Sequence, residues 1–185
     1  MMKFKILGVG GSLRKGSFSK ALLLEAKKLS PEEVDFEIWE DYDFPAYNPD
    51  IEIPENVKEF KDKIKNADAI LFSLPEYDYS IPGFIKNAID WASRPYGDNS
   101  WEDKPAAIMS ESIGTTAGSK AQYHLRQVLV YLNVHPLNKP EFMVPNAVDK
   151  FDKEGNLTDE ETRAKIKPLI EALIAWTNKL KYFLR

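Results

Sequence analysis

The apolar residues of this chain follow two different spacings along its length. Short runs that are mostly apolar, or that alternate strictly with polar residues, are typical of strands. Such runs lie at residues 4–9, 34–39, 67–74, 105–110 and 141–144. Longer segments with apolar residues on one helical face are typical of amphipathic helices, and they lie at residues 19–29, 55–66, 83–92, 123–132 and 158–180. The pattern therefore predicts strands and helices in regular alternation.

This alternation favours an α/β fold with a parallel sheet covered by helices on both faces. The strict alternation of residues 34–39 is the pattern of a half-buried strand at a sheet edge. No repeat, low-complexity tract or linker divides the 185 residues, so we predict a single domain spanning residues 1–185. Ligands of such sheets bind beyond the carboxyl ends of the strands. The loops after the first, third and fourth strands are therefore the expected place for a site.

The composition excludes several kinds of chemistry. The chain has no cysteine, which rules out disulfides, thiolate nucleophiles and cysteine metal sites. Its two histidines, His124 and His135, lie apart and do not form a metal-ligand pair, so we expect no bound metal. A net charge of −4 without a long basic patch argues against a nucleic-acid partner. No targeting pattern or apolar run of membrane-spanning length is visible, and we expect a cytoplasmic protein with no membrane partner.

The segment after the first strand has the residues of a phosphate-binding loop. Residues 10–19 read Gly-Gly-Ser-Leu-Arg-Lys-Gly-Ser-Phe-Ser. The dinucleotide fingerprint fails there because Leu13 replaces its third glycine, and the nucleotide-triphosphate loop fails because Ser17 replaces its lysine. Three hydroxyls and one guanidinium remain near a helix start: Ser12, Arg14, Ser17 and Ser19. These groups and the first N–H groups of a helix suit a single terminal phosphate.

A structural alternative exists for each of these residues taken singly. Ser17 or Ser19 would then be only the N-cap of the following helix, and Arg14 would be solvated. The cluster as a whole, placed directly after a buried strand, favours the phosphate interpretation.

Three ordered motifs are similar to those of one known family. Residues 75–95 read P-E-Y-D-Y-S-I-P-G-F-I-K-N-A-I-D-W-A-S-R-P. This run resembles the P-E-Y-N-x-S-I-P-G-x-L-K-N-A-I-D-W-x-S-R-P signature of NADPH-dependent FMN reductases, a family that includes quinone, chromate and azo-dye reductases. Residues 11–19 resemble the family's phosphate loop, and residues 121–127 (A-Q-Y-H-L-R-Q) resemble one of its helices. The resemblance implies a flavodoxin-like fold, a doubly wound five-stranded parallel sheet, and FMN reduced by NADPH or NADH.

The resemblance also implies which residues contact the cofactor. The phosphate contacts would come from Ser12, Arg14, Ser17, Phe18 and Ser19. The flavin ring would be lined, largely by backbone groups, by Pro75, Glu76, Tyr77, Asp78 and Tyr79. The third loop would close the other side of the ring with Ser110, Ser112 and Gly114. Backbone groups on a proline-restricted loop suit the polar edge of a flat flavin. The chemistry of these residues therefore agrees with the flavin contacts that the resemblance implies.

Several side chains near these motifs keep two interpretations. Tyr77 and Tyr79 can stack on the flavin or on a nicotinamide, or they can instead pack between subunits. Glu76 either orients the ribityl chain or is an idle surface carboxylate. His124 is either a proton donor to a quinone or a surface residue of its helix.

Two residues depart from the family's pattern. Asp78 stands where asparagine is commoner, and a carboxylate near the flavin would disfavour an anionic reduced ring. Ala117 precedes Gly118 where the family more often has a Gly-Gly pair, so the third loop is expected to shape a different substrate pocket.

Residues 76–79 also contain no glycine, and Asp78 is the one residue there expected to tolerate positive φ. A peptide flip that would stabilise a one-electron flavin state is therefore disfavoured, and we expect two-electron transfer.

The function that these observations favour is an enzyme with no catalytic side chain, because a bound flavin supplies the chemistry. NAD(P)H would reduce bound FMN, and the flavin would reduce a quinone, chromate, an azo dye or free flavin. The alternative is a flavodoxin-type electron carrier without its own substrate, which Arg14 and the modest net charge disfavour. A flavin-free interaction protein is disfavoured by the intact loops.

We also expect a homodimer or homotetramer, because the helices after the second and third loops carry much apolar and aromatic surface. The residues concerned are Phe84, Ile85, Ile89, Trp91, Tyr123, His124 and Val128.

Overall fold

The sheet has the predicted parallel order. The computed structural model describes residues 3–183. Its strands are β1 (Phe4–Gly10), β2 (Val34–Ile38), β3 (Ala69–Pro75), β4 (Pro105–Glu111), β5 (His135–Pro136) and β6 (Phe142–Val144). All pairs are parallel, in the order β2-β1-β3-β4-β5, and β6 also pairs with β4. This is the flavodoxin-like doubly wound order, so the predicted fold class is confirmed.

The fifth strand position is divided between two short segments. β5 pairs with Pro105–Ala106 at the start of β4, while β6 pairs with Met109–Glu111 at its end. Pro136 ends β5 and Pro140 lies between the two segments, and proline cannot donate to a strand ladder. The sequence pattern predicted β6, at residues 141–144, but it did not predict β5.

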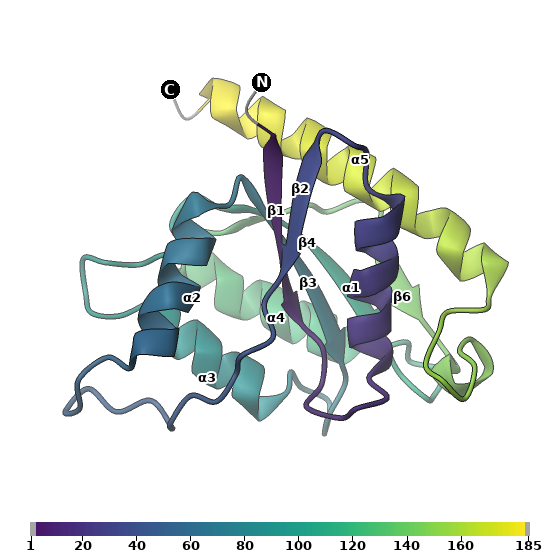
Figure 1. Ribbon diagram of the computed structural model, residues 1–185, viewed down its shortest axis with the longest axis horizontal. Coiled ribbons are helices and arrows are strands. Elements are labelled where there is room, and N and C mark those ends of the chain that lie inside the picture. The colour runs from purple at the N-terminus through teal and green to yellow at the C-terminus, as the bar shows by residue number, and fades with distance from the viewer. Residues whose placement is uncertain (1–2, 184–185) are drawn as a thin grey trace.

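The helices lie close to their predicted bounds. They are α1 (Phe18–Leu29), α2 (Glu55–Asn66), α3 (Gly83–Ala92), α4 (Ser119–Tyr131) and α5 (Glu160–Phe183), with a short 3₁₀ turn, η1, at Ala147–Asp149. One face of the sheet packs against α1 and α5, and the other packs against α2, α3 and α4 (Figure 1). Within residues 3–183 no helix is long and apolar enough to cross a membrane.

Alternate residues of the central strands enter the two cores. In β3, Leu71 belongs to the cluster with α1 and α5, while Ile70 and Phe72 belong to the cluster with α2, α3 and α4. Burial of each such side chain contributes about 1.5–3 kcal/mol, which fixes the strand register.

Three apolar residues of α3 that we expected to lie between subunits are buried within the chain. Ile85, Ile89 and Trp91 are each at most 2% exposed. Their helical spacing reflects packing onto the sheet, so this part of the argument for an oligomer was wrong.

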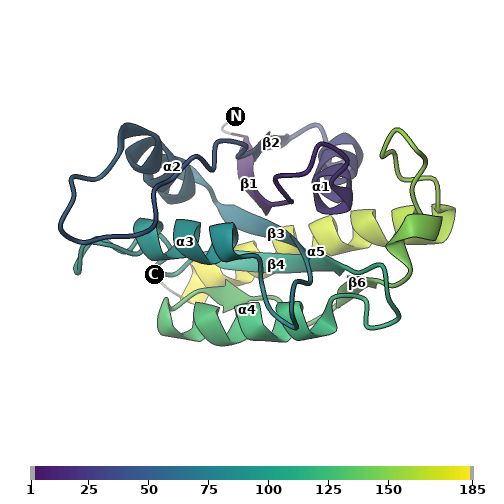
Figure 2. The same ribbon diagram turned by 90° about the horizontal axis from the view of Figure 1, so that it is seen from below.

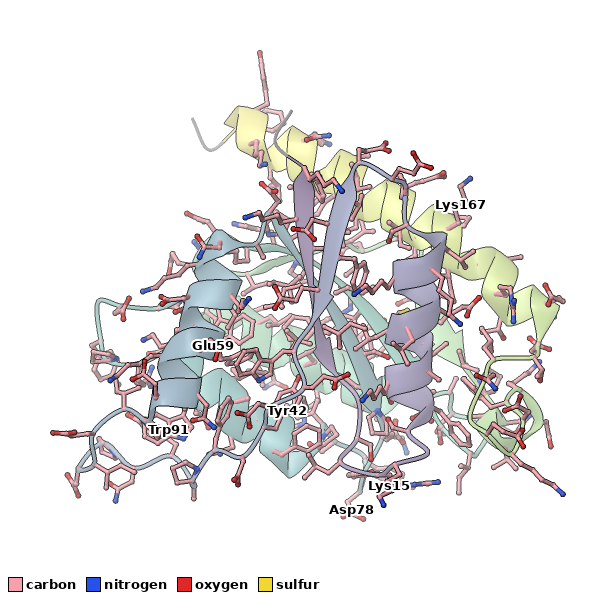
Figure 3. All side chains as sticks on the ribbon, in the orientation of Figure 1. Lys15, Tyr42, Glu59, Asp78, Trp91 and Lys167 are labelled. Carbon is pink, nitrogen blue, oxygen red and sulfur yellow. The ribbon has the colours of Figure 1, made fainter. Side chains whose placement is uncertain are left out.

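The strand register brings three loops to one edge of the sheet. Gly10 at the end of β1 is paired with Ser73 of β3, and Pro75 at the end of β3 is paired with Glu111 at the end of β4. The chain therefore leaves these strands at the same edge, at the bottom of Figure 1 and towards the viewer in Figure 2. Lys15 and Asp78, which belong to two of these loops, project from this end of the molecule (Figure 3).

Candidate functional site

A cavity of about 220 Å³ lies among the three loops at the carboxyl edge of the sheet. Its lining comes from all three loops: Ser12, Arg14, Ser17, Phe18, Pro75, Glu76, Tyr77, Glu111, Ser112 and Ile113. Most of the predicted site residues are in this set. Glu111 and Ile113 were not predicted individually, and Ser19, Asp78, Tyr79, Ser110 and Gly114 do not line it.

Close contact between β1 and β3 determines how the first loop begins. The N–H of Gly11 donates to the carbonyl oxygen of Ser73 at 2.8 Å. At Gly10, where φ is +137°, a Cβ atom would lie 2.0 Å from that same oxygen. Any other residue at position 10 would push the strands apart, so a glycine is required where the phosphate loop starts.

The N-terminus of α1 faces the cavity with free donors. Ser17 is the N-cap, and its Oγ accepts the N–H of Lys20 at 3.1 Å, so Ser17 caps the helix and also lines the cavity. Within residues 3–183 the N–H groups of Phe18 and Ser19 have no recorded acceptor. Such amides, together with the positive end of a helix dipole, have the character of an anion-binding group.

Ser19 differs from the sequence prediction in its side chain. Its hydroxyl is fully buried and donates to Oε1 of Glu111 at 2.8 Å. In this structure the Oγ of Ser19 is therefore directed to Glu111, and Ser19 does not line the cavity.

Arg14 and Phe18 form the outer part of the phosphate loop. The guanidinium carbon of Arg14 lies 5.8 Å from the centre of the Phe18 ring, a distance suited to a cation–π contact. The Phe18 ring in turn stacks on Phe151, with centroids 4.7 Å apart. This stack holds the ring beneath the arginine, so that Arg14 lines the cavity while remaining accessible to solvent.

The second loop contains a tight reversal. The N–H of Tyr77 donates to the carbonyl of Ser80 at 3.0 Å, and the reverse bond is 2.8 Å. Asp78 and Tyr79 between them have φ of 50° and 63°, the signature of a type I′ turn. Our expectation that Asp78 alone would tolerate positive φ was therefore wrong, because Tyr79 also adopts it.

The turn exposes two side chains and brings a third to the cavity. Asp78 lies at the tip (Figure 3), and Tyr79 is 69% exposed with the ammonium of Lys120 3.0 Å from its ring centre. The hydroxyl of Tyr77 is 3.1 Å from Oγ of Ser12, which joins the first and second loops across the cavity.

Glu76 has a structural role that the sequence did not indicate. Its Oε2 accepts the N–H groups of Lys120 and Ala121 at 3.0 and 3.3 Å. The N-cap residue of α4 is Gly118, which has no capping side chain. Glu76 therefore caps α4 from a distant loop and fixes the second loop relative to the third.

The third loop is held by buried polar contacts. Ser110 is fully buried, donates to the carbonyl of Ala117 at 2.9 Å and accepts from Gln122 at 3.1 Å. Ala117 and Gly118 both have positive φ, so the position where the family more often has glycine keeps a glycine-like conformation. Ser110 therefore supports the loop from beneath, while Ser112 reaches the cavity.

His124 lies beside the second loop, outside the lining of the cavity. Its Nδ1 is 2.8 Å from Oγ of Ser80, which joins α4 to the turn.

Glu111 is a residue of the cavity lining that our sequence interpretation did not single out. Its side chain is 5% exposed at the end of β4, and burial raises the pKa of its carboxyl, opposed by the Ser19 hydrogen bond and the charge of Arg14. A carboxylate immediately after the apolar run of residues 105–110 was the available signal.

The sheet order defines a flavodoxin-like fold, with a cavity between three loops at the carboxyl edge of a doubly wound sheet. Residues 4–149 match the family described as NADPH-dependent FMN reductase. The chain is 46% identical over 180 residues to an NAD(P)H-dependent FMN reductase of Pseudomonas aeruginosa, covering 96% of this chain and 97% of that one. It is 45% identical over 187 residues to an NAD(P)H:quinone oxidoreductase of Solanum tuberosum, covering 96% and 94%.

A comparison with a solved structure supports the same family assignment. The flavoenzyme NAD(P)H:(acceptor) oxidoreductase of Paracoccus denitrificans superimposes with a TM-score of 0.86 at 36% identity, over 95% of this chain and 98% of that one. The chain belongs to the NADPH-dependent FMN reductase family, and the predicted class of NAD(P)H-dependent oxidoreductase is confirmed.

Proposed function

We propose that the protein binds FMN at the three-loop cavity and uses NADH or NADPH to reduce a quinone or another small acceptor by two-electron transfer. The observation that supports this most directly is the donor set at the start of α1. Ser12, Ser17 and Arg14 line the cavity beside two helix N–H groups that have no recorded partner within residues 3–183. These donors suit one phosphate ester, and the loop sequence lacks a dinucleotide fingerprint. Both observations favour FMN over FAD.

The three loops divide the work of holding the cofactor. Arg14 and the hydroxyls of Ser12 and Ser17 bind the phosphate, while the backbone of Pro75 to Tyr77 binds the polar edge of the ring. FMN, when bound, supplies the redox chemistry by accepting a hydride equivalent from a nicotinamide and delivering two electrons to the acceptor. The chain itself orients the reactants and needs no acid or base side chain for this reaction.

The relatives' names support the choice of acceptor. An NAD(P)H:quinone oxidoreductase and an NAD(P)H-dependent FMN reductase both align with nearly the whole chain. A quinone is therefore the first acceptor to test, and free flavin is the second.

The test is a visible spectrum of the purified protein followed by anaerobic addition of NADH or NADPH. We expect an FMN spectrum that bleaches on addition of a nicotinamide and returns when a quinone is added. Extracted FAD in place of FMN, or no flavin uptake when either is supplied, would overturn the cofactor assignment. A flavin that neither nicotinamide reduces would instead indicate an electron carrier.

A further inference from the structure

Glu111 lies where an anionic ligand is expected to bind. Glu111 lines the same cavity as the proposed phosphate donors Ser12, Arg14 and Ser17. Its side chain is 5% exposed, and one oxygen accepts the hydroxyl of Ser19 at 2.8 Å. No hydrogen-bond partner for its other oxygen is recorded among residues 3–183.

The charged groups of the surrounding elements leave Glu111 without a close cation. The neighbouring strand residues, Pro75 of β3 and Val144 of β6, do not titrate. Lys20 of α1 pairs with Glu40 at 2.9 Å, and Arg163 of α5 pairs with Glu25 at 3.4 Å. Within residues 3–183 no cation lies within 4.0 Å of the Glu111 carboxyl.

The remaining titratable groups belong to the cavity itself. Arg14 acts on Glu111 from the first loop at longer range and favours the charged carboxylate. Glu76 and Tyr77 line the cavity from the second loop; Glu76 is held by the N-terminus of α4, and Tyr77 by Ser12. Arg14 is therefore the cation that a phosphate and Glu111 would share.

A phosphate ester near pH 7 carries between one and two negative charges, since its second pKa is about 6. Two anions in one poorly solvated site disfavour each other, and the proton goes to the group whose negative charge is stabilised less. A bound phosphate would be stabilised by Arg14 and the helix N–H groups, whereas Glu111 is buried and accepts one hydrogen bond, from Ser19. We propose that Glu111 binds a proton when the phosphate of FMN enters the cavity, so that the neutral carboxyl accommodates the phosphate dianion. This inference rests on the proposed function, because it concerns the same ligand.

The proton uptake has a measurable consequence for ligand affinity. A ligand that binds the protonated form loses affinity as the pH rises through the pKa of the free protein, by at most about tenfold per pH unit for one proton. Riboflavin has the same ring and ribityl chain but no phosphate, so its affinity should lack this dependence. Glu111 therefore makes the preference for FMN over riboflavin decrease as the pH rises.

The experiment is a titration of the apoprotein with FMN and with riboflavin by flavin fluorescence, from about pH 7.5 to about pH 9, where the phosphate is already a dianion. For the wild type, we expect the ratio of the FMN Kd to the riboflavin Kd to rise by about tenfold or more, corresponding to a shift of one pKa unit. Glu111→Gln keeps an acceptor for Ser19 but cannot titrate, and its ratio should stay constant over this range. Glu171→Gln, an equal change of charge on the exposed face of α5, should behave as the wild type.

Proton uptake gives a second measurement that does not require the variant to fold. Calorimetric titration of the wild type with FMN in buffers of different ionisation enthalpy should show net proton binding near pH 8, where the phosphate is already a dianion. Riboflavin should show none.

A constant affinity ratio in the wild type, or no net proton uptake with FMN, would overturn the role of Glu111 while leaving FMN binding intact. An absence of FMN binding at every pH, in wild type and variant alike, would instead refute the proposed function.

Discussion

Arg14 has the side chain whose loss should weaken the cofactor site most directly. Of the described residues that line the cavity, it alone carries a positive charge. Losing a charge-assisted hydrogen bond costs about 1.5–3 kcal/mol, or roughly one to two decades in Kd. Arg14→Ala should therefore weaken FMN binding by that factor in a fluorescence titration, with little effect on unfolding. Lys15→Ala is the matched control, since Lys15 is exposed and lines a different cavity; equal affinities of the two variants would contradict the role of Arg14.

Substitution by alanine should change the free energy of unfolding very differently at two glycines of the first loop, Gly10 and Gly16. A Cβ at Gly10 would lie 2.0 Å from a backbone oxygen, whereas at Gly16 the nearest atom within 4 Å is the mobile end of Arg14 at 3.9 Å. Gly10→Ala should lower the free energy of unfolding by about 1–3 kcal/mol or more, while Gly16→Ala should change it by less than about 1 kcal/mol. Urea unfolding followed by circular dichroism measures both, and a tolerated Gly10→Ala would show that β1 and β3 can separate at this point.

At the scale of elements, Glu76 couples the second loop to the start of α4. Removal of a helix cap costs about 0.5–2 kcal/mol, so Glu76→Ala should destabilise the protein by that amount. Hydrogen exchange at the N–H groups of Lys120 and Ala121 should also accelerate, because these groups lose their acceptor. Glu141→Ala provides the control, since this exposed carboxylate accepts the hydroxyl of Tyr123 on α4 and no backbone N–H of that helix among residues 3–183. Unchanged exchange in Glu76→Ala would mean that α4 is capped by solvent.

The elements differ in how far the sequence could predict them. The periodic apolar pattern gave α2 and α3 with their observed bounds, because burial of one helical face determines both helices. The two-residue strand β5 is too short for any period to be detected, and its second residue is Pro136. The positive φ of Tyr79 arises from closure of the turn between Tyr77 and Ser80, which overrides the residue's own preference.

In the candidate site, too, the sequence predicted features that depend on neighbouring residues, but not contacts between distant ones. Local motifs predicted the residues of the first loop that line the cavity, because helix capping and phosphate binding both use neighbouring residues. The pairing of Ser19 with Glu111 joins positions 92 residues apart, and the contact of Glu76 with Lys120 spans 44. Such contacts depend on the strand register, so a single sequence can indicate the residues but not their partners.

At the scale of the whole molecule, the exposed face of α4 supports self-association. Tyr123, Val130 and Tyr131 are 56%, 76% and 72% exposed, and large apolar side chains grouped on one helix are typical of subunit contacts. Tyr79 is 69% exposed beside the same helix, with Lys120 over its ring. The proposed homodimer or homotetramer therefore rests on α4 and the neighbouring turn, since the apolar residues of α3 are largely buried.

The oligomer can be tested by placing charge on this face. Val130→Glu combined with Tyr131→Glu should convert a dimer or tetramer into monomers at micromolar concentration, because two carboxylates would have to be desolvated at each copy of the interface. Tyr182→Glu, at a 79% exposed aromatic residue of α5, should leave the assembly unchanged. Sedimentation velocity measures the outcome, with circular dichroism to show that each variant is folded. A wild-type protein that sediments as a monomer would refute self-association, and an intact oligomer in the double variant would place the interface away from the end of α4.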